Sequence, residues 1–360
     1  MEDLRDARLI RGIIEKVANY KKRFQFMHAC GTHQETLVRY GLDSLYINAG
    51  ITVKSGPGCP VCVTTADEFV KVMALAENGK TVAVYGDCIK VPVNKKSLMQ
   101  LKEEGCDIRV VYSIEEALNI AKVVKRDVIF MAIGFETTAP NTAITLMSED
   151  LPENFYVFSC HRRFVPAMVK LLTMGETKLQ GLIEPGHVSV IIGTKPYDEI
   201  RRKFKIPQVI SGFEPLDMTI SVYNLVLQNL RGEPIVENEY SRVVSEDGNL
   251  RAKKVMEEVF LNRDGDWRGI PDVPASLMGI KEKYSSHDAS KQFEDILVDA
   301  NYQMSPLESS CRCGEVLRGV INPNECPLFN KVCTLENPVG ACMVSTEGAC
   351  RIQAEFSIEY

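Results

Sequence analysis

The C-terminal end most constrains what this chain can fold into, because six of its twelve cysteines lie within the last fifty residues. Their spacing reads C-x-C-x12-C-x6-C-x8-C-x7-C, and glycines and prolines recur between them. A segment with so many turns has little continuous apolar surface, and burying that surface cannot by itself offset the entropy that the segment loses when it becomes ordered. We therefore expect a clamp of disulfides, zinc or an iron–sulfur cluster. The cysteines are Cys311, Cys313, Cys326, Cys333, Cys342 and Cys350.

The N-terminal sequence and the charge balance narrow the choice of clamp. The chain opens with MEDLRDARLI, which lacks the apolar core of a signal peptide, and it has no apolar run of about 18 residues. We therefore expect a cytoplasmic protein without a membrane segment, in which clustered cysteines serve as ligands or redox groups. A net charge of −6 and the lack of a basic run argue against a nucleic-acid partner.

The spacing of the C-terminal cysteines is compatible with both zinc and an iron–sulfur cluster. Four thiolates suit zinc as well as an iron–sulfur cluster, but zinc sites usually pair their cysteines in short knuckles. The gaps here are longer and irregular, and the compact cysteine run of bacterial ferredoxins is missing too. This favours an iron–sulfur cluster over zinc, with inert or regulatory thiols as a third interpretation. One cluster needs four ligands, so two cysteines are left as a candidate redox pair.

Apolar strands alternate with amphipathic helices through most of the chain. After an amphipathic helix within residues 1–23, strands are expected at segments such as TVAVYGD, DIRVVYS and DVIFMAIG, each followed by a helical pattern. This alternation predicts parallel sheets covered by helices on both faces. From residue 235 to residue 310 the pattern becomes helical and irregular, with a linker expected near Pro271 and Pro274.

Cys30 follows the first expected strand, in the turn Cys-Gly-Thr-His. We expect a helix to start near Gln34 with Thr32 as its cap. Cys30 would then feel the positive end of the helix dipole, which lowers the pKa of a thiol. His33 is close enough in sequence to share a metal or a proton with Cys30. A half-buried cysteine beside a capping turn is the structural alternative.

A second turn, SGPGCPVC, ends the expected strand ITVKS and precedes a helix that Thr64 or Thr65 can cap. Cys59 and Cys62 form a C-x2-C pair at a helix start. This geometry lowers the pKa of one thiol and permits an internal disulfide. A zinc half-site is the alternative, with its other ligands supplied from elsewhere in the chain.

Further reactive side chains also follow expected strand ends or lie in turns. Ligands of open α/β sheets bind outside the carboxyl ends of the strands, so we expect these side chains on one rim or in a cleft between two sheets. For each single carboxylate, a helix cap or a salt bridge is the simpler interpretation. The residues are Asp87, Glu136, Cys160, His161, His187 and Glu214.

Eight segments, in order along the chain, closely resemble the hydrogenase maturation factor HypD family. The match runs from about residue 20 to residue 352, and the segments read HACGTHQE, SGPGCPVC, YGD, GFETTAP, EPGHVS, SGFEP, CRCGEVLRG and PVGACMVSTEGACR. One departure is Gln34, which stands where the family usually shows a glutamate after Cys-Gly-Thr-His. Glu35 would then take the place of that acid.

The resemblance implies a fold of two parallel-sheet α/β domains, residues 24–125 and 126–230. A third, mainly helical or irregular domain, residues 1–23 and 231–360, would carry a [4Fe–4S] cluster. The implied function is that of a scaffold and redox protein for the Fe(CN)2CO unit of [NiFe]-hydrogenase. Its implied partners are the small chaperone HypC and the cyanide donor HypE. The residues do not decide whether such a protein turns over as an enzyme.

The resemblance also implies roles for the cysteines. Cys313 and Cys342 would form a redox dithiol beside the cluster, as in ferredoxin–thioredoxin reductase, and Cys59 with Cys62 a second dithiol. Cys30 would be the thiolate that holds the iron, with His33 beside it. The implied cluster ligands are Cys311, Cys326, Cys333 and Cys350, and the weaker candidates for the iron cleft are His187, Asp87, Glu136 and Glu347.

Two other functions compete with assembly of the iron unit. One is a disulfide reductase that uses an iron–sulfur cluster and electrons from ferredoxin. The other is a zinc-stapled binding module without redox chemistry.

Overall fold

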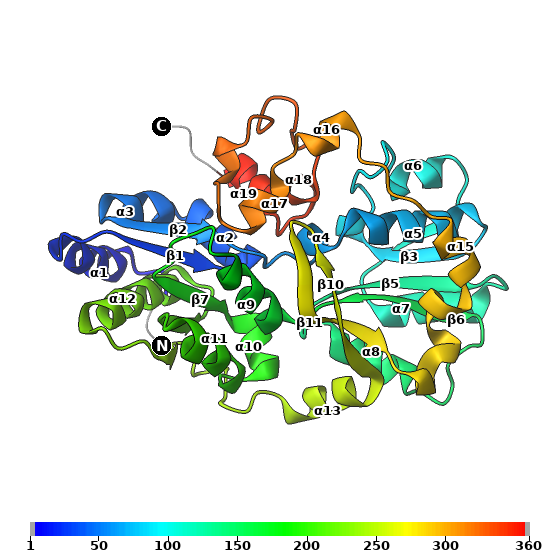
Figure 1. Cartoon of the computed structure of the whole chain (residues 1–360), viewed down its shortest axis with the longest axis horizontal. Coiled ribbons are helices and arrows are strands. Elements are labelled where there is room, and N and C mark those ends of the chain that lie inside the picture. The colour runs from blue at the N-terminus through cyan, green and yellow to red at the C-terminus, as the bar shows by residue number, and fades with distance from the viewer. Residues whose placement is uncertain (1–3, 357–360) are drawn as a thin grey trace.

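The computed structural model describes residues 4–356, which fold into two α/β lobes with a β-hairpin between them and the C-terminal segment along one side (Figure 1). Residues 1–3 and 357–360, the two ends of the predicted third domain, lie outside the described residues. None of the helices in the described part of the chain combines the length and the apolar character needed to cross a membrane.

The first lobe is built on a five-stranded parallel sheet in the order β2-β1-β7-β8-β9. Several helices bury their apolar residues against one face of this sheet, in a core that includes Phe26, Tyr46 and Val222. The strands are β1 (Phe24–His28), β2 (Ile51–Ser55), β7 (Gly181–Pro185), β8 (Gln208–Ser211) and β9 (Val236–Asn238). The helices are α1 (Ala7–Asn19), α2 (Gly31–Arg39), α3 (Leu42–Asn48), α10 (Gly186–Ile192), η2 (Lys195–Tyr197), α11 (Asp198–Phe204) and α12 (Pro215–Arg231).

The second lobe is built on a four-stranded parallel sheet in the order β4-β3-β5-β6. β5 is buried along all seven residues, because helices cover both faces of the sheet there. The strands are β3 (Thr81–Tyr85), β4 (Ile108–Val111), β5 (Val128–Gly134) and β6 (Phe155–His161). The helices are α4 (Pro60–Val63), α5 (Ala66–Glu77), η1 (Gly86–Cys88), α6 (Leu98–Glu103), α7 (Ile114–Val123) and α8 (Ala139–Leu146). Helix α9 (Phe164–Met174) follows β6 but packs against α11 of the first lobe and against β11 (Ile270–Ile280). The prediction of helix-covered parallel sheets is confirmed.

The strands are not divided between the sheets at residue 125, where the sequence placed the boundary of the first domain. β1 and β2 pair with β7, β8 and β9, whereas β3 and β4 pair with β5 and β6. The chain therefore crosses to the second lobe after β2 and returns to the first lobe after β6, through α9. Hydrophobic alternation identifies a strand but not its neighbours, so the pattern could not locate these crossings.

The segment predicted to be helical and irregular contains a long antiparallel hairpin, β10 (Phe260–Trp267) with β11 (Ile270–Ile280). The predicted linker at Pro271 and Pro274 is wrong, because both prolines lie inside β11. Register shifts in the ladder fall beside these positions, so the missing N–H groups do not interrupt a regular run of hydrogen bonds. The helical elements around the hairpin are α13 (Leu250–Val259), η3 (Glu282–His287), α14 (Ala289–Gln292) and α15 (Glu294–Val298).

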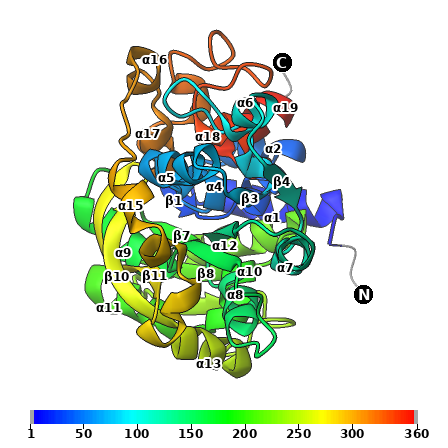
Figure 2. The same cartoon turned by 90° about the vertical axis from the view of Figure 1, so that its right-hand side faces the viewer.

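The cysteine-rich segment lies across the top of both lobes and contains only short helices (Figure 2). These are α16 (Pro306–Ser309), α17 (Cys313–Leu317), η4 (Pro323–Glu325), α18 (Ala341–Val344) and α19 (Ala349–Phe356). α19 packs against α2 of the first lobe, and α17 and α18 pack against α4 of the second lobe. The segment thus covers the two turns that carry Cys30 and the Cys59–Cys62 pair.

Candidate thiol and metal site

Cys30 lies just after β1 and is the N-cap residue of α2. The predicted helix start near Gln34 and the predicted cap at Thr32 are wrong, because the amide of Gln34 already donates to the Cys30 carbonyl at 3.1 Å. Two glycines bring other segments onto this turn. A Cβ atom on Gly58 would stand 2.2 Å from the carbonyl carbon of Ala29, and one on Gly31 would stand 2.5 Å from the Cβ of Glu347. Cys30 therefore lies between the SGPGCPVC turn and the C-terminal segment.

The pKa of the Cys30 thiol is shifted in the direction opposite to the prediction. Burial raises the pKa of the Cys30 thiol to about 11, and the main-chain N–H of His33 at the helix start lowers it only in part. The loss of hydration around a buried thiolate outweighs the dipole of a short helix. At neutral pH the thiol keeps its proton, and a metal ion would have to displace that proton on binding.

His33 is held as a neutral ring. Its Nε2 lies 3.0 Å from the Gly212 carbonyl oxygen, which can only accept, so Nε2 carries the proton. Burial lowers the pKa of His33 to about 3. Nδ1 is buried without a hydrogen-bond partner among the described residues, so the ring presents one unused acceptor in the neighbourhood of Cys30.

His28 was not recognised as a site residue from the sequence. The amide of Cys30 donates to its Nδ1 at 3.4 Å, so Nε2 carries the proton and donates to Gln34 Oε1 at 2.7 Å. Glu35 does not take the inward position, because it points outward and pairs with Arg39 at 2.8 Å. Gln34 therefore supports the turn through His28. The available signal was the side-chain period of β1, which places His28 on the same side of the strand as Phe26.

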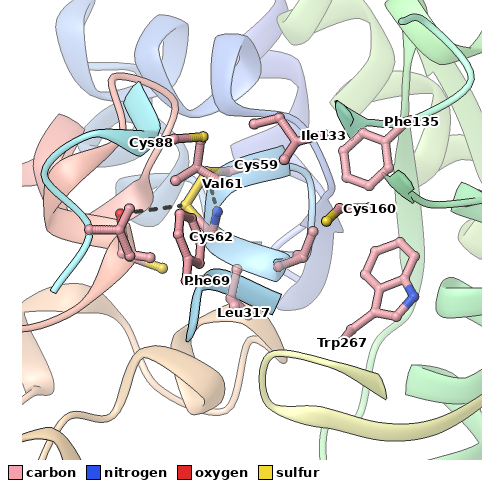
Figure 3. Close-up of a cluster of buried hydrophobic side chains, with 14 of the residues drawn as sticks. Cys59, Val61, Cys62, Phe69, Cys88, Ile133, Phe135, Cys160, Trp267 and Leu317 are labelled. Atoms are coloured by element: carbon pink, nitrogen blue, oxygen red, sulfur yellow. Dashed lines mark hydrogen bonds between the residues drawn. A yellow bond between two sulfur atoms is a disulfide. The ribbon is translucent and has the colours of Figure 1, made fainter. Parts of the chain in front are cut away.

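Cys59 and Cys62 form the internal disulfide that their spacing permits (Figure 3). The pair is buried, and the amide of Cys62 donates to Cys59 Sγ at 3.2 Å. The predicted cap of the next helix is confirmed, because Thr65 and Glu68 form a capping box at the start of α5. Cys88 and Cys160 lie in the same apolar core (Figure 3).

The six C-terminal cysteines line a single small, partly open hollow. Gly340 forms part of its wall, and a Cβ atom there would stand 2.6 Å from Cys311 Sγ. The amide of Val339 donates to Cys333 Sγ at 3.3 Å. Within residues 4–356, no group of three or more His, Cys, Asp or Glu side chains converges closely enough to hold a metal ion in place.

Cys313 and Cys342, the pair left over from the expected cluster ligands, interact directly inside this hollow. Contacts with Cys311 and Cys342 lower the pKa of Cys313, whereas contact with Cys313 raises the pKa of both Cys311 and Cys342. Cys342 also interacts with Cys350. The thiols on this side of the hollow therefore form a continuous series.

The disulfide touches the wall of the hollow. Cys62 Sγ lies 4.0 Å from the carbonyl oxygen of Ala341, the residue before Cys342. On its other side the disulfide follows Gly58, which packs on the main chain of Ala29 and Cys30. The three segments that carry these sulfur groups are therefore in contact through main-chain atoms.

Two carboxylates join the C-terminal segment to this site. Asp87, after β3, accepts hydrogen bonds from the Ser345 hydroxyl at 2.9 Å and from the amide and hydroxyl of Thr346 at 2.9 and 2.7 Å. Glu347 packs on Gly31 and acts electrostatically on Cys30, and burial raises the pKa of Glu347 to about 7.

The remaining candidates divide into two groups. The ring of His187 stacks on Phe213 at 3.9 Å, and Phe213 lies 5.0 Å from the ring of His33, so His187 belongs to the Cys30 side of the site. Glu136 has the structural role of a cap, because both carboxyl oxygens accept from the amide of Phe164 at the start of α9. Glu214 likewise caps α12.

Comparison with known proteins places the whole chain in one family. The family described as Hydrogenase formation hypA family, HypD, matches residues 6–357. A putative hydrogenase expression/formation protein of Methanocaldococcus jannaschii is 44% identical over 98% of both chains. Hydrogenase maturation factor HypD2 of Bradyrhizobium diazoefficiens is 42% identical over 97% of this chain and 94% of its own. HypD of Escherichia coli is 38% identical over 92% and 88%. The chain therefore belongs to the HypD family.

Proposed function

We propose that this protein acts in hydrogenase maturation as the scaffold on which the Fe(CN)2CO unit of [NiFe]-hydrogenase is assembled. Its proposed partners are a small HypC-type chaperone and a HypE-type cyanide donor. The names of the relatives support the role in maturation. The observation that carries the finer proposal is the contact path from the cysteine-lined hollow through the Cys59–Cys62 disulfide to Cys30.

The hollow fits a resident [4Fe–4S] cluster. Its lining is dominated by sulfur, and the amide of Val339 is placed to stabilise negative charge on Cys333. At Gly340 any larger residue would collide with Cys311. Such a cluster supplies single electrons when bound. The proposed ligands are Cys311, Cys326, Cys333 and Cys350, which leaves Cys313 and Cys342 as a neighbouring dithiol.

The residues of the chain have separate tasks in this proposal. The Cys59–Cys62 disulfide takes up two electrons and two protons and becomes a dithiol next to Cys30. Cys30 gives up its proton and binds the incoming iron as a soft thiolate ligand, the type that low-spin iron with cyanide and carbonyl ligands prefers. His33, whose ring burial keeps neutral and whose Nε2 is bound to the Gly212 carbonyl, orients the turn, and the proton of Cys30 leaves to solvent.

Infrared spectroscopy of the anaerobic complex tests the proposal. The wild-type protein purified with its small chaperone should show bands of iron-bound cyanide and carbonyl, and the Cys30→Ala variant should lose them. Cys59→Ala and Cys62→Ala should also lose the bands but keep the visible absorption of the cluster. Cys106→Ala is the matched control, because Cys106 is a partly exposed thiol outside the site. Bands that persist without Cys30 would refute the scaffold role.

A second function, reduction of protein disulfides with electrons from ferredoxin, is suggested by the contact between the Cys59–Cys62 pair and the cysteine-lined hollow. Burial of both sulfur-bearing residues argues against it, because a protein substrate has to reach the attacking thiolate. Multiple turnovers of a protein disulfide by the isolated protein with reduced ferredoxin would favour the reductase.

A further inference from the structure

One buried carboxyl group beside the sulfur site has no hydrogen-bond partner among the described residues. Glu184 lies on β7 with its side chain fully buried, and both of its carboxyl oxygens lack a partner. An ionised carboxylate in such a place would be very costly. Burial alone raises the pKa of Glu184 to about 8, so the group holds a proton at neutral pH.

Glu184 lies one strand away from the Cys30 turn. Ile183 pairs with His28 in the parallel ladder, so Glu184 and Ala29 come next to each other on adjacent strands. Leu182 belongs to the same apolar core as the Cys59–Cys62 disulfide, and Glu184, two residues later, points to the same face of the sheet. The carbonyl of Ala29 is in turn the group on which Gly58 packs. Glu184 and the disulfide therefore flank the same short stretch of main chain.

A hydrogen-bonded series next to Glu184 has a fixed direction. The hydroxyl of Ser189 donates to the Pro185 carbonyl at 2.8 Å, so the Tyr197 hydroxyl donates to Ser189 Oγ at 2.7 Å. The oxygen of Tyr197 can then only accept a further bond. Glu184 acts electrostatically on Tyr197, and a protonated Glu184 is a donor of the kind that this oxygen lacks.

The same tyrosine connects Glu184 to the protein surface. Tyr197 is fully buried, and Glu136 also acts on it electrostatically. Glu136 lines a surface groove between α9 and η2, together with Arg163 and Pro196. The titratable groups that surround Tyr197 are therefore Glu184, Glu136 and Cys30. Glu184, Tyr197 and Glu136 therefore form a set of interacting buried groups, one of which lines the groove.

We propose that Glu184 donates one of the two protons needed when the buried Cys59–Cys62 disulfide is reduced. The sulfur–sulfur bond breaks, two electrons arrive from the reductant, and each sulfur takes up one proton. Glu184 provides one proton and is refilled from the groove by way of Glu136 and Tyr197, and solvent provides the other. The inference rests on the proposed redox use of this disulfide.

The test uses the full-length protein with dithiothreitol as the reductant, without iron or partner proteins. Dithiothreitol gives two electrons and becomes a cyclic disulfide. Newly formed thiols at Cys59 and Cys62 are trapped by alkylation and counted by mass spectrometry between pH 6 and pH 9. The Glu184→Gln variant should react at least about tenfold more slowly than wild type at pH 6.5. The difference should vanish near pH 9, where Glu184 has lost its proton.

Glu239→Gln is the matched control. Burial raises the pKa of Glu239 to about 7, but its carboxylate accepts from the Gly212 amide at 3.0 Å and lies near Arg242. The Cys59–Cys62 disulfide of this variant should be reduced at the wild-type rate. A constant ratio of the Glu184→Gln and wild-type rates across the pH range would overturn the proposal, as would equal slowing in the control or a disulfide that resists dithiothreitol at every pH.

Infrared spectroscopy gives a readout that does not depend on the rate. Wild-type protein at pH 7 should show a carbonyl stretching band of a protonated carboxyl group that shifts in heavy water and is missing from Glu184→Gln. An unchanged band in the variant would overturn the assignment of the proton to Glu184. Normal reduction kinetics without assembly of the iron unit would instead contradict the proposed function and leave the proton route standing.

Discussion

The pH dependence of stability should change in a defined way when Glu184 is replaced by glutamine. Burial raises the pKa of Glu184 from its ordinary value of 4.5 to about 8. Below pH 4.5 the acid is protonated in both the folded and the unfolded chain, so the free energy of unfolding does not depend on its titration. Above pH 4.5 the unfolded chain loses the proton and the folded chain keeps it, so stability falls as the pH rises to about 8.

The expected magnitude follows from this shift. Each pH unit between the two pKa values lowers the free energy of unfolding by about 1.4 kcal/mol. Between pH 5.5 and pH 7.5 the wild type should therefore lose about 2.5 kcal/mol relative to Glu184→Gln, which has the same shape and no titration; the slope is slightly smaller near the folded pKa. Urea unfolding of both proteins at four pH values measures this difference. Other buried acids titrate in both proteins, so their contributions cancel.

A difference that stays constant with pH would refute the reasoning. It would mean that Glu184 keeps an ordinary pKa in the folded chain, through a partner or water molecules that stabilise its charge. A difference that grows in the opposite direction would mean that the carboxylate is stabilised in the folded state. Glu239→Gln serves as the control here too. Its difference in stability from the wild type should change with pH only up to about pH 7, because the pKa of Glu239 is about 7.

Three further results are expected. Gly58→Ala should lower the free energy of unfolding by about 1–3 kcal/mol in urea titrations, because the new Cβ would stand 2.2 Å from main-chain atoms after β1, and no loss would contradict this contact. Arg162→Ala should lower the free energy of unfolding by about 3–5 kcal/mol. Arg162 Nη2 lies 2.5 Å from Glu68 Oε2, and the substitution leaves that carboxylate without its buried partner. Iodoacetamide should label Cys106 in the folded protein within minutes but should not label Cys88. Cys88 is fully buried, and burial raises its pKa. Labelling of Cys88 before Cys106 would contradict its burial.

The sequence predicted the parts of the site better than their environment. Apolar strands and the turns after them were readable because their pattern is local, and the Cys30 and Cys59–Cys62 turns do follow β1 and β2. The pKa of Cys30 was predicted in the wrong direction, because the helix dipole is a local feature and burial is not. Burial comes from Glu347 and Gly58, which lie on segments that arrive from elsewhere in the chain.

The hairpin and the crossing between the lobes escaped prediction for a related reason. Pro271 and Pro274 usually mark a loop, and only the register shifts opposite them make a strand possible there. In the same way, nothing in the alternation of strands and helices indicates that β7, β8 and β9 return to the sheet of β1. These features depend on which partner each strand finds, and the order of the strands along the chain does not contain that information.

The crossing between the lobes has a consequence for the site. Because the chain leaves the first lobe after β2 and returns before β7, the Cys59–Cys62 turn lies where the two lobes meet. The C-terminal segment then has to contact both lobes to bring Cys342 next to this turn, and it does so through Asp87 on one lobe and Gly31 on the other. Both turns follow neighbouring strands of the first sheet, but α4, which carries Cys62, packs on β5 of the second lobe. One short segment can therefore cover the Cys30 turn through α19 and the disulfide through α17 and α18, at the place where the two lobes meet.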